Sequence, residues 1–184
     1  MHFYILAGGK SRRFGQNKAL FVFEGRSILE RLIAAIPPAS AIFLVTNSPT
    51  EYAHLNFPAI ADHYPGCGPL AGIHAGLAHS PQEWNFFLAC DFPNLQPATI
   101  TEILLAPRDA QVIVPQTAEG LQPLCALWAK TALPAVEKAL QKQEHRVQTI
   151  LANLSLRVVA LSDSQALFNL NTPEDLHRLQ TLRH

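Results

Sequence analysis

FYILAGGKSRRFGQNK, residues 3–18, is the stretch from which the fold of this 184-residue chain can be argued. Its apolar start is typical of a buried β-strand, and two glycines follow at once. Glycines let backbone N–H groups approach a ligand closely, and the cations after them can neutralise a polyphosphate. The stretch therefore predicts a nucleotide site in a strand-to-loop junction. The alternative is a glycine-rich turn with solvated surface cations.

Two common phosphate-binding loops are excluded by their glycine spacing. The end of a P-loop is present as GKS at residues 9–11, but Tyr4 occupies the position of the glycine that must come five residues before Gly9. The Rossmann fingerprint fails too, because Gly8, Gly9 and Gly15 do not have its spacing.

Length and composition indicate a one-domain globular protein rather than a nucleic-acid scaffold or a membrane-spanning protein. The chain is 48% hydrophobic and 15% charged with zero formal net charge, which argues against disorder and against a basic nucleic-acid scaffold. No apolar run reaches membrane-spanning length. The three cysteines are widely spaced and form no Cys-x-x-Cys pair, so structural zinc and disulfides are not expected. We expect a cytoplasmic protein with one domain over residues 1–184.

Apolar strands and amphipathic helices alternate along the chain. Continuous apolar runs predict buried strands at 41–45 and 84–89, and shorter runs predict strands at 111–114, 124–128 and 157–161. Helices are predicted at 28–36 with Ser27 as the N-cap, from Pro69 to Leu77, at 99–105, 131–142 and 147–154, and after Thr172. This order predicts an α/β fold, a three-layer α/β/α domain with a mostly parallel sheet.

Polar side chains follow the predicted strands. Asn47 and Asp91 come directly after two of them, and Asp62 precedes a glycine-rich segment. Ligands of such folds lie at the carboxyl ends of the strands, and an aspartate there often holds magnesium. The alternative for Asn47 and Asp62 is a turn role, and for Asp91 a cap after its strand.

Four segments together resemble the molybdenum cofactor guanylyltransferases. They are LAGG at 6–9 with Arg13, Gly15 and Lys18, GPLAG at 68–72, CDFP at 90–93, and NLNTPEDL at 169–176. The resemblance spans almost the whole chain and implies a Rossmann-like nucleotidyltransferase fold. It also implies transfer of GMP from GTP to the terminal phosphate of molybdopterin, which forms the guanine dinucleotide cofactor and pyrophosphate.

The resemblance implies a role for each matching position. Catalytic residues would be Lys18, Asp91 and Arg13, with Mg2+ held by Asp91. Nucleotide-binding residues would be Leu6, Ala7, Gly8, Lys18, Asn47, Asp62 and Asp91. Molybdopterin-binding residues would be Arg13, Gly68, Gly72, Arg146, Asn169 and Asn171.

Several of these residues also have an alternative explanation that involves no ligand. Lys18 and Arg146 could be solvated cations, Arg12 could replace Arg13, and the two asparagines could simply shape the approach to the last helix. The family usually has an aspartate where this chain has Asn17. We expect Asn17 to substitute by hydrogen bonding within the loop, because Asp91 remains to hold the metal.

The implied chemistry needs no general base, because a phosphate monoester with a second pKa of about 6 is mostly dianionic at neutral pH. The implied partners are GTP and molybdopterin, with transient contacts to molybdenum-insertion proteins and acceptor molybdoenzymes. Three rivals remain. A molybdopterin cytidylyltransferase typically reads Leu-Ala-Ala-Gly at residues 6–9, a sugar-phosphate nucleotidyltransferase is usually longer, and a non-catalytic nucleotide-binding accessory protein would bind nucleotide without releasing pyrophosphate.

Overall fold

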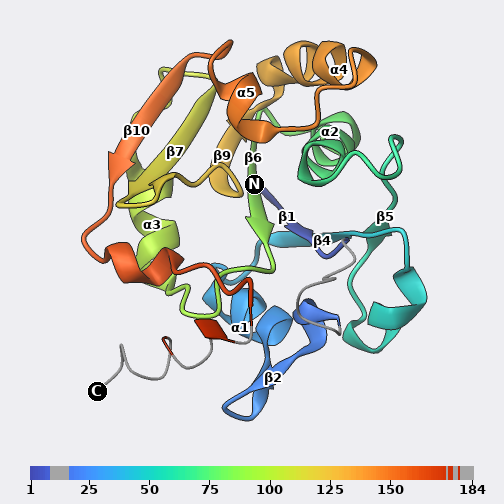
Figure 1. Cartoon of the computed structure of the whole chain (residues 1–184), viewed down its shortest axis with the longest axis vertical. Coiled ribbons are helices and arrows are strands. Elements are labelled where there is room, and N and C mark those ends of the chain that lie inside the picture. The colour runs from blue at the N-terminus through green and yellow to red at the C-terminus, as the bar shows by residue number, and fades with distance from the viewer. Residues whose placement is uncertain (9–16, 173, 176–177, 179–184) are drawn as a thin grey trace.

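The computed structural model describes residues 1–8, 17–172, 174–175 and 178. Within them, one eight-stranded sheet has the order β10-β7-β9-β6-β1-β4-β5, with β8 paired beside β7 (Figure 1). The strands are β1 (His2–Leu6), β2 (Val22–Phe23), β3 (Arg26–Ser27), β4 (Ala41–Val45), β5 (Ala59–Ile60), β6 (Trp84–Ala89), β7 (Val112–Thr117), β8 (Gly120–Leu121), β9 (Cys125–Ala129) and β10 (Leu156–Ala160).

Most neighbours in the sheet are parallel. β1 pairs in parallel with β4 and β6, β4 with β5, and β10 with β7. β9 runs antiparallel between β6 and β7, and β8 is antiparallel to β7. The predicted mostly parallel sheet is therefore confirmed.

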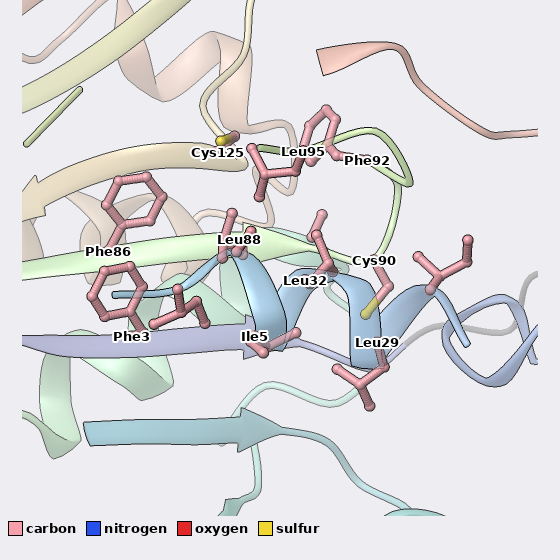
Figure 2. Close-up of a cluster of buried hydrophobic side chains, with 14 of the residues drawn as sticks. Phe3, Ile5, Leu29, Leu32, Phe86, Leu88, Cys90, Phe92, Leu95 and Cys125 are labelled. Carbon is pink, nitrogen blue, oxygen red and sulfur yellow. The ribbon is translucent and has the colours of Figure 1, made fainter. Parts of the chain in front are cut away.

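Helices cover both faces of the sheet, as the alternation of buried side chains along β1 requires. Phe3 and Ile5 pack in one apolar cluster, whereas Tyr4 and Leu6 pack in a second cluster on the opposite face. The first cluster joins the sheet to α1 (Ile28–Ala35) and α3 (Pro97–Leu105), and Figure 2 shows part of it. The second joins it to α2 (Pro69–His79), α4 (Leu133–Gln141) and α5 (Val147–Leu151). The three-layer α/β/α prediction is confirmed.

Local sequence signals found the longer elements. The strands predicted at 41–45 and 84–89 have those bounds, and Ser27 caps α1 in a reciprocal capping box with Glu30. Helix α4 begins two residues later than predicted because a 3-10 turn (Lys130–Ala132) precedes it, and α5 ends at Leu151 rather than at residue 154. The β2–β3 hairpin, β5 and the 3-10 segments Lys18–Leu20, Pro49–Leu55 and Ser164–Leu167 were not predicted.

The parallel strands bring their carboxyl ends to one edge of the sheet. Leu6 at the end of β1 is in register with Val45 of β4 on one side and Ala89 of β6 on the other. The loops that leave these strands therefore start side by side, and Asn47 and Asp91 lie in them. Among the described residues, no helix is long and apolar enough to cross a bilayer.

Candidate active site

A cavity of about 230 Å³ lies at this edge of the sheet. Five segments supply its walls: the end of β1, the 3-10 turn at Lys18, the start of α2, the end of β6 and the residue before β9. Its lining residues are Leu6, Ala7, Gly8, Asn17, Lys18, Ala19, Gly68, Pro69, Ala89, Cys90, Asp91 and Leu124. Five of the residues assigned to the nucleotide from sequence, namely Leu6, Ala7, Gly8, Lys18 and Asp91, thus meet in one cavity.

Lys18 and Asp91 form an ion pair at the cavity wall, between the Lys18 ammonium and Asp91 Oδ1. The Lys18 side chain is only 11% exposed, and that of Asp91 is 29% exposed. A lysine so far withdrawn from water requires an anionic or strongly polar partner. The reading of Lys18 as a solvated loop cation is therefore wrong.

Residues 168–172, which we call the C-terminal segment, contact both members of this ion pair. The Leu170 N–H donates to the Asp91 carbonyl at 2.8 Å. Lys18 Nζ donates to the Leu170 carbonyl at 2.7 Å and to Asn171 Oδ1 at 3.3 Å. Leu170, 152 residues after Lys18 in the sequence, thereby helps to fix the lysine side chain at the cavity wall.

Asn17 is held by three hydrogen bonds. Its Oδ1 accepts from the Ala19 N–H at 3.1 Å and so caps the turn that carries Lys18. Its Nδ2 donates to Glu51 Oε2 at 2.7 Å and to the Tyr52 hydroxyl oxygen at 2.9 Å. The Tyr52 hydroxyl in turn donates to the Ala7 carbonyl at 2.7 Å. The network links the Lys18 turn to the backbone that leaves β1.

Asn47 and Asp62 form a second polar pair outside the lining of the cavity. Asn47 Nδ2 donates to Asp62 Oδ2 at 2.8 Å, and the Asp62 N–H donates to Asn47 Oδ1 at 3.2 Å. Asp62 Oδ1 is buried and has no hydrogen-bond partner among the described residues. A buried carboxylate oxygen without a donor is costly, so Asp62 Oδ1 is an acceptor of this pair that calls for an explanation.

Helix α2 starts at the cavity. Gly68, its N-cap, has φ of 67°, a left-handed conformation that favours glycine, and Pro69 follows at the first turn. The positive end of the helix dipole at this point suits an anionic group. Gly72 is one turn further along and does not line the cavity. A Cβ there would come within 2.8 Å of Leu6, so the structure gives Gly72 a packing role against β1.

Asn169 and Arg146, two of the remaining predicted positions, are not among the residues that line the cavity. Asn169 Nδ2 lies 3.4 Å from Glu119 Oε2, on the β7–β8 side. Arg146 is the exposed N-cap residue of α5 and does not line the cavity. Arg13 lies outside the described residues.

The cavity wall offers no activated nucleophile among its described residues. Cys90 is buried, and this burial raises the pKa of its thiol far above the usual range. A thiol that stays protonated is a poor nucleophile. The prediction that Cys90 is a buried apolar residue is in line with its place in the first cluster, shown in Figure 2.

Sequence reasoning missed Glu51, Tyr52 and the Leu170 carbonyl. Tyr52 and Glu51 belong to a short 3-10 segment, and no periodicity marks such a segment as part of a site. A backbone carbonyl carries no signal in side-chain chemistry. The one available hint was Asn17 itself, since an amide can donate where an aspartate cannot.

The chain is similar to known proteins over most of its length. Residues 3–158 match the family model described as the MobA-like NTP transferase domain. A "Probable molybdenum cofactor guanylyltransferase" from Carboxydothermus hydrogenoformans is 37% identical over 184 residues, which cover 95% of this chain and 92% of that one. A "Molybdenum cofactor guanylyltransferase" from Desulfosudis oleivorans is 33% identical, with 96% and 92% covered.

A solved structure shares the fold over the whole chain. The molybdopterin-guanine dinucleotide biosynthesis protein A from Archaeoglobus fulgidus superposes with a TM-score of 0.84, covering 100% of this chain and 98% of the other at 23% identity. At this identity the likeness shows the fold.

Proposed function

Because this chain belongs to the molybdenum cofactor guanylyltransferase family of nucleotidyltransferases, we propose that it joins GMP from GTP to the terminal phosphate of molybdopterin. The products are the guanine dinucleotide form of the cofactor and pyrophosphate. The observation that carries the proposal is the Lys18–Asp91 ion pair at the wall of the cavity formed by the glycine loop and α2.

The nucleotide phosphates are proposed to lie between Lys18 and the first turn of α2. Ala7 and Gly8 present backbone at the cavity, and Gly68 and Pro69 bring the positive helix end opposite. The free acceptor of Asp62 has the right chemistry for the N1–H and exocyclic amine of guanine. Asn47 would hold the other carboxylate oxygen in place, as its 2.8 Å hydrogen bond does now.

Asp91 is proposed to hold Mg2+. No cluster of three candidate ligands occurs in the described part of the chain, and a single carboxylate suits magnesium, which takes its other ligands from phosphates and water. The 29% exposure of the Asp91 side chain leaves it accessible from the cavity. When bound, the ion would neutralise phosphate charge that builds up during displacement.

The chain's own residues then position two anions for an in-line displacement. An oxygen of the molybdopterin phosphate attacks the α-phosphorus of GTP, a new P–O bond forms, and the bond to the β-phosphate oxygen breaks. The dianionic phosphate needs no base. Lys18, joined by Arg13, offsets the charge on the departing pyrophosphate.

Molybdopterin is proposed to enter beside the start of α2 and the C-terminal segment. Gly68 lines the cavity, and Asn169 and Arg146 would extend the binding surface away from it. We further propose a cytoplasmic location, a single domain over residues 1–184, and transient contacts with molybdenum-insertion proteins and acceptor molybdoenzymes.

The direct test supplies the purified protein with Mg2+, molybdenum-loaded molybdopterin and either GTP or CTP, and measures pyrophosphate and dinucleotide. Product from GTP alone supports the proposal. Nucleotide binding without product from either would point to a non-catalytic accessory protein, and product with sugar phosphates to a sugar-phosphate nucleotidyltransferase.

Product from CTP would favour a molybdopterin cytidylyltransferase, and Gly8 allows a sharper version of this test. A Cβ at Gly8 would meet only ordinary contacts, 3.6 Å from the Val45 carbonyl oxygen and 3.9 Å from Thr46 Cα. Gly8→Ala should therefore keep the fold. If the glycine makes room for guanine, this variant loses GTP turnover while its free energy of unfolding stays within about 0.5 kcal/mol of the parent.

A further inference from the structure

Among the residues that the structure describes, the Lys18 ammonium has as many hydrogen-bond acceptors as it has N–H donors. It has three N–H donors, and three acceptors surround it: the Asp91 carboxylate, the Leu170 carbonyl at 2.7 Å and Asn171 Oδ1 at 3.3 Å. A phosphate oxygen can bind Lys18 only by replacing one of these acceptors.

Hydrogen bonds of their own backbone hold the acceptors of the C-terminal segment in place. Leu170 is fully buried, and its N–H is fixed to the Asp91 carbonyl at 2.8 Å. Asp175 Oδ2 accepts from the N–H groups of both Asn171 and Thr172, each at 2.9 Å. This capping turn holds Asn171 where its side chain reaches Lys18.

Asp91 is the acceptor that substrate binding would release. Its carboxylate is the group proposed to take the metal, and a bound cation beside it weakens the hold on a neighbouring ammonium. The Leu170 carbonyl and Asn171 Oδ1 are neutral and have no such competitor. They can keep the ammonium at the cavity wall while its third donor turns to a phosphate.

We propose that Asn171 is a positioning residue for Lys18, which acts on the GTP phosphates through that lysine rather than by binding molybdopterin. The inference rests on the proposed function for its nucleotide. It reassigns Asn171 from the molybdopterin side of the site to the nucleotide side. The adjacent Asn169 has the same side chain but contacts Glu119 and Gln122 instead, which makes it a matched control.

The first experiment needs no substrate. The rate at which an acylating reagent modifies Lys18 is measured by peptide mass spectrometry in the ligand-free protein. Asn171→Ala should raise this rate by about tenfold, the equivalent of one charge-assisted hydrogen bond, and Asn169→Ala should leave it unchanged. Asn171→Asp keeps an acceptor and should restore slow labelling. Equal labelling of Lys18 in the parent and Asn171→Ala, or fast labelling in Asn171→Asp, would overturn the proposal.

The second experiment measures the Kd for Mg·GTP without molybdopterin in a double-mutant cycle. Asn171→Ala should weaken binding by about tenfold in the parent and have no effect in a Lys18→Met background, because its action passes through Lys18. A Kd within twofold of the parent, together with a raised KM for molybdopterin, would return Asn171 to the molybdopterin side. If the parent binds GTP but makes no dinucleotide, the proposed transfer fails while both experiments still decide the role of Asn171.

Discussion

A buried tyrosine hydroxyl lies near each end of strand β1, one from Tyr4 of the strand itself and one from Tyr52 of the 3-10 segment Pro49–Leu55. The two hydroxyls differ in their hydrogen-bond partners. At the amino end the Tyr4 hydroxyl lies 3.0 Å from His79 Nδ1 and 3.3 Å from His2 Nδ1. At the carboxyl end the Tyr52 hydroxyl donates to the Ala7 carbonyl and accepts from Asn17. Both hydroxyls are nearly inaccessible, and burial raises the pKa of each.

The difference lies in where each network leads. The Tyr4 network continues through His2 to Ser80, whose hydroxyl lies 3.2 Å from His2 Nδ1. Its side chains thus contact one another at the end of the sheet away from the cavity. The Tyr52 network runs through Asn17 to the turn that carries Lys18 and to the wall of the cavity. Polar groups at the amino end should therefore stabilise the fold, whereas those at the carboxyl end should position Lys18 for catalysis.

The largest effect expected at the carboxyl end is that of Asp91→Asn. The substitution keeps the shape of the side chain but removes the charge proposed to hold the metal. We expect dinucleotide formation to fall by at least about 100-fold. The free energy of unfolding should fall by only about 1 kcal/mol, because Lys18 keeps two other acceptors and the pair is partly open to solvent. Steady-state turnover and urea unfolding give the two numbers, and turnover within threefold of the parent would remove Asp91 from the mechanism.

Asn17→Asp tests whether the amide donor is needed at the same end. An aspartate would place a second carboxylate beside Glu51 and would leave the Tyr52 hydroxyl oxygen without its donor. We expect the Kd for GTP, measured by calorimetry, to rise by about tenfold.

The companion change is Glu51→Gln. In the double variant the glutamine amide can donate to the carboxylate introduced by Asn17→Asp, so Glu51→Gln should restore most of the lost affinity there and have little effect alone. Unaltered GTP affinity in Asn17→Asp would show that the network does not position Lys18. A loss that persists undiminished in the double variant would mean that carboxylate repulsion is not its cause.

The two tyrosines can be compared by removing one oxygen atom from each. Tyr52→Phe leaves the buried Ala7 carbonyl without its donor and should cost about 1–2 kcal/mol of stability and raise the KM for GTP several-fold. Tyr4→Phe should cost about 0.5–1 kcal/mol, because the exposed His79 can bond to water instead, and should leave KM and kcat unchanged. Equal effects of the two variants on KM and kcat would show that the two ends of β1 do not differ in their contribution to catalysis.

The sequence predicted the fold well because its signals were local. Apolar runs marked β4 and β6, and Ser27 with Glu30 marked the start of α1. The parallel topology then brought Lys18 and Asp91 to one edge, as the strand-end rule expects.

What could not be predicted depends on contacts between distant segments. The lysine's acceptors come from Leu170 and Asn171, and the donor for Tyr52 comes from Asn17, 35 residues earlier. No periodicity encodes such pairs. Gly72 likewise has a role that its motif did not reveal, because its close approach to Leu6 makes it a packing residue against β1, whereas its part in ligand binding stays a prediction.

The smallest expected effect concerns pH and belongs to the amino end. Burial, followed by the charges of the amino terminus and His79, lowers the pKa of His2 below its usual 6.5. As pH falls through about 6.5 the unfolded chain takes up a proton that the folded His2 does not, so stability falls with it. His2→Asn should keep a polar atom near Tyr4 and Ser80 but remove the titration, since an asparagine amide can occupy the position of Nδ1. The loss in unfolding free energy between pH 7.5 and pH 5 should then shrink without vanishing, because burial also lowers the pKa of His74. The kinetic constants at pH 7.5 should match those of the parent, and a variant with the parent's full acid sensitivity would show that His2 does not supply it.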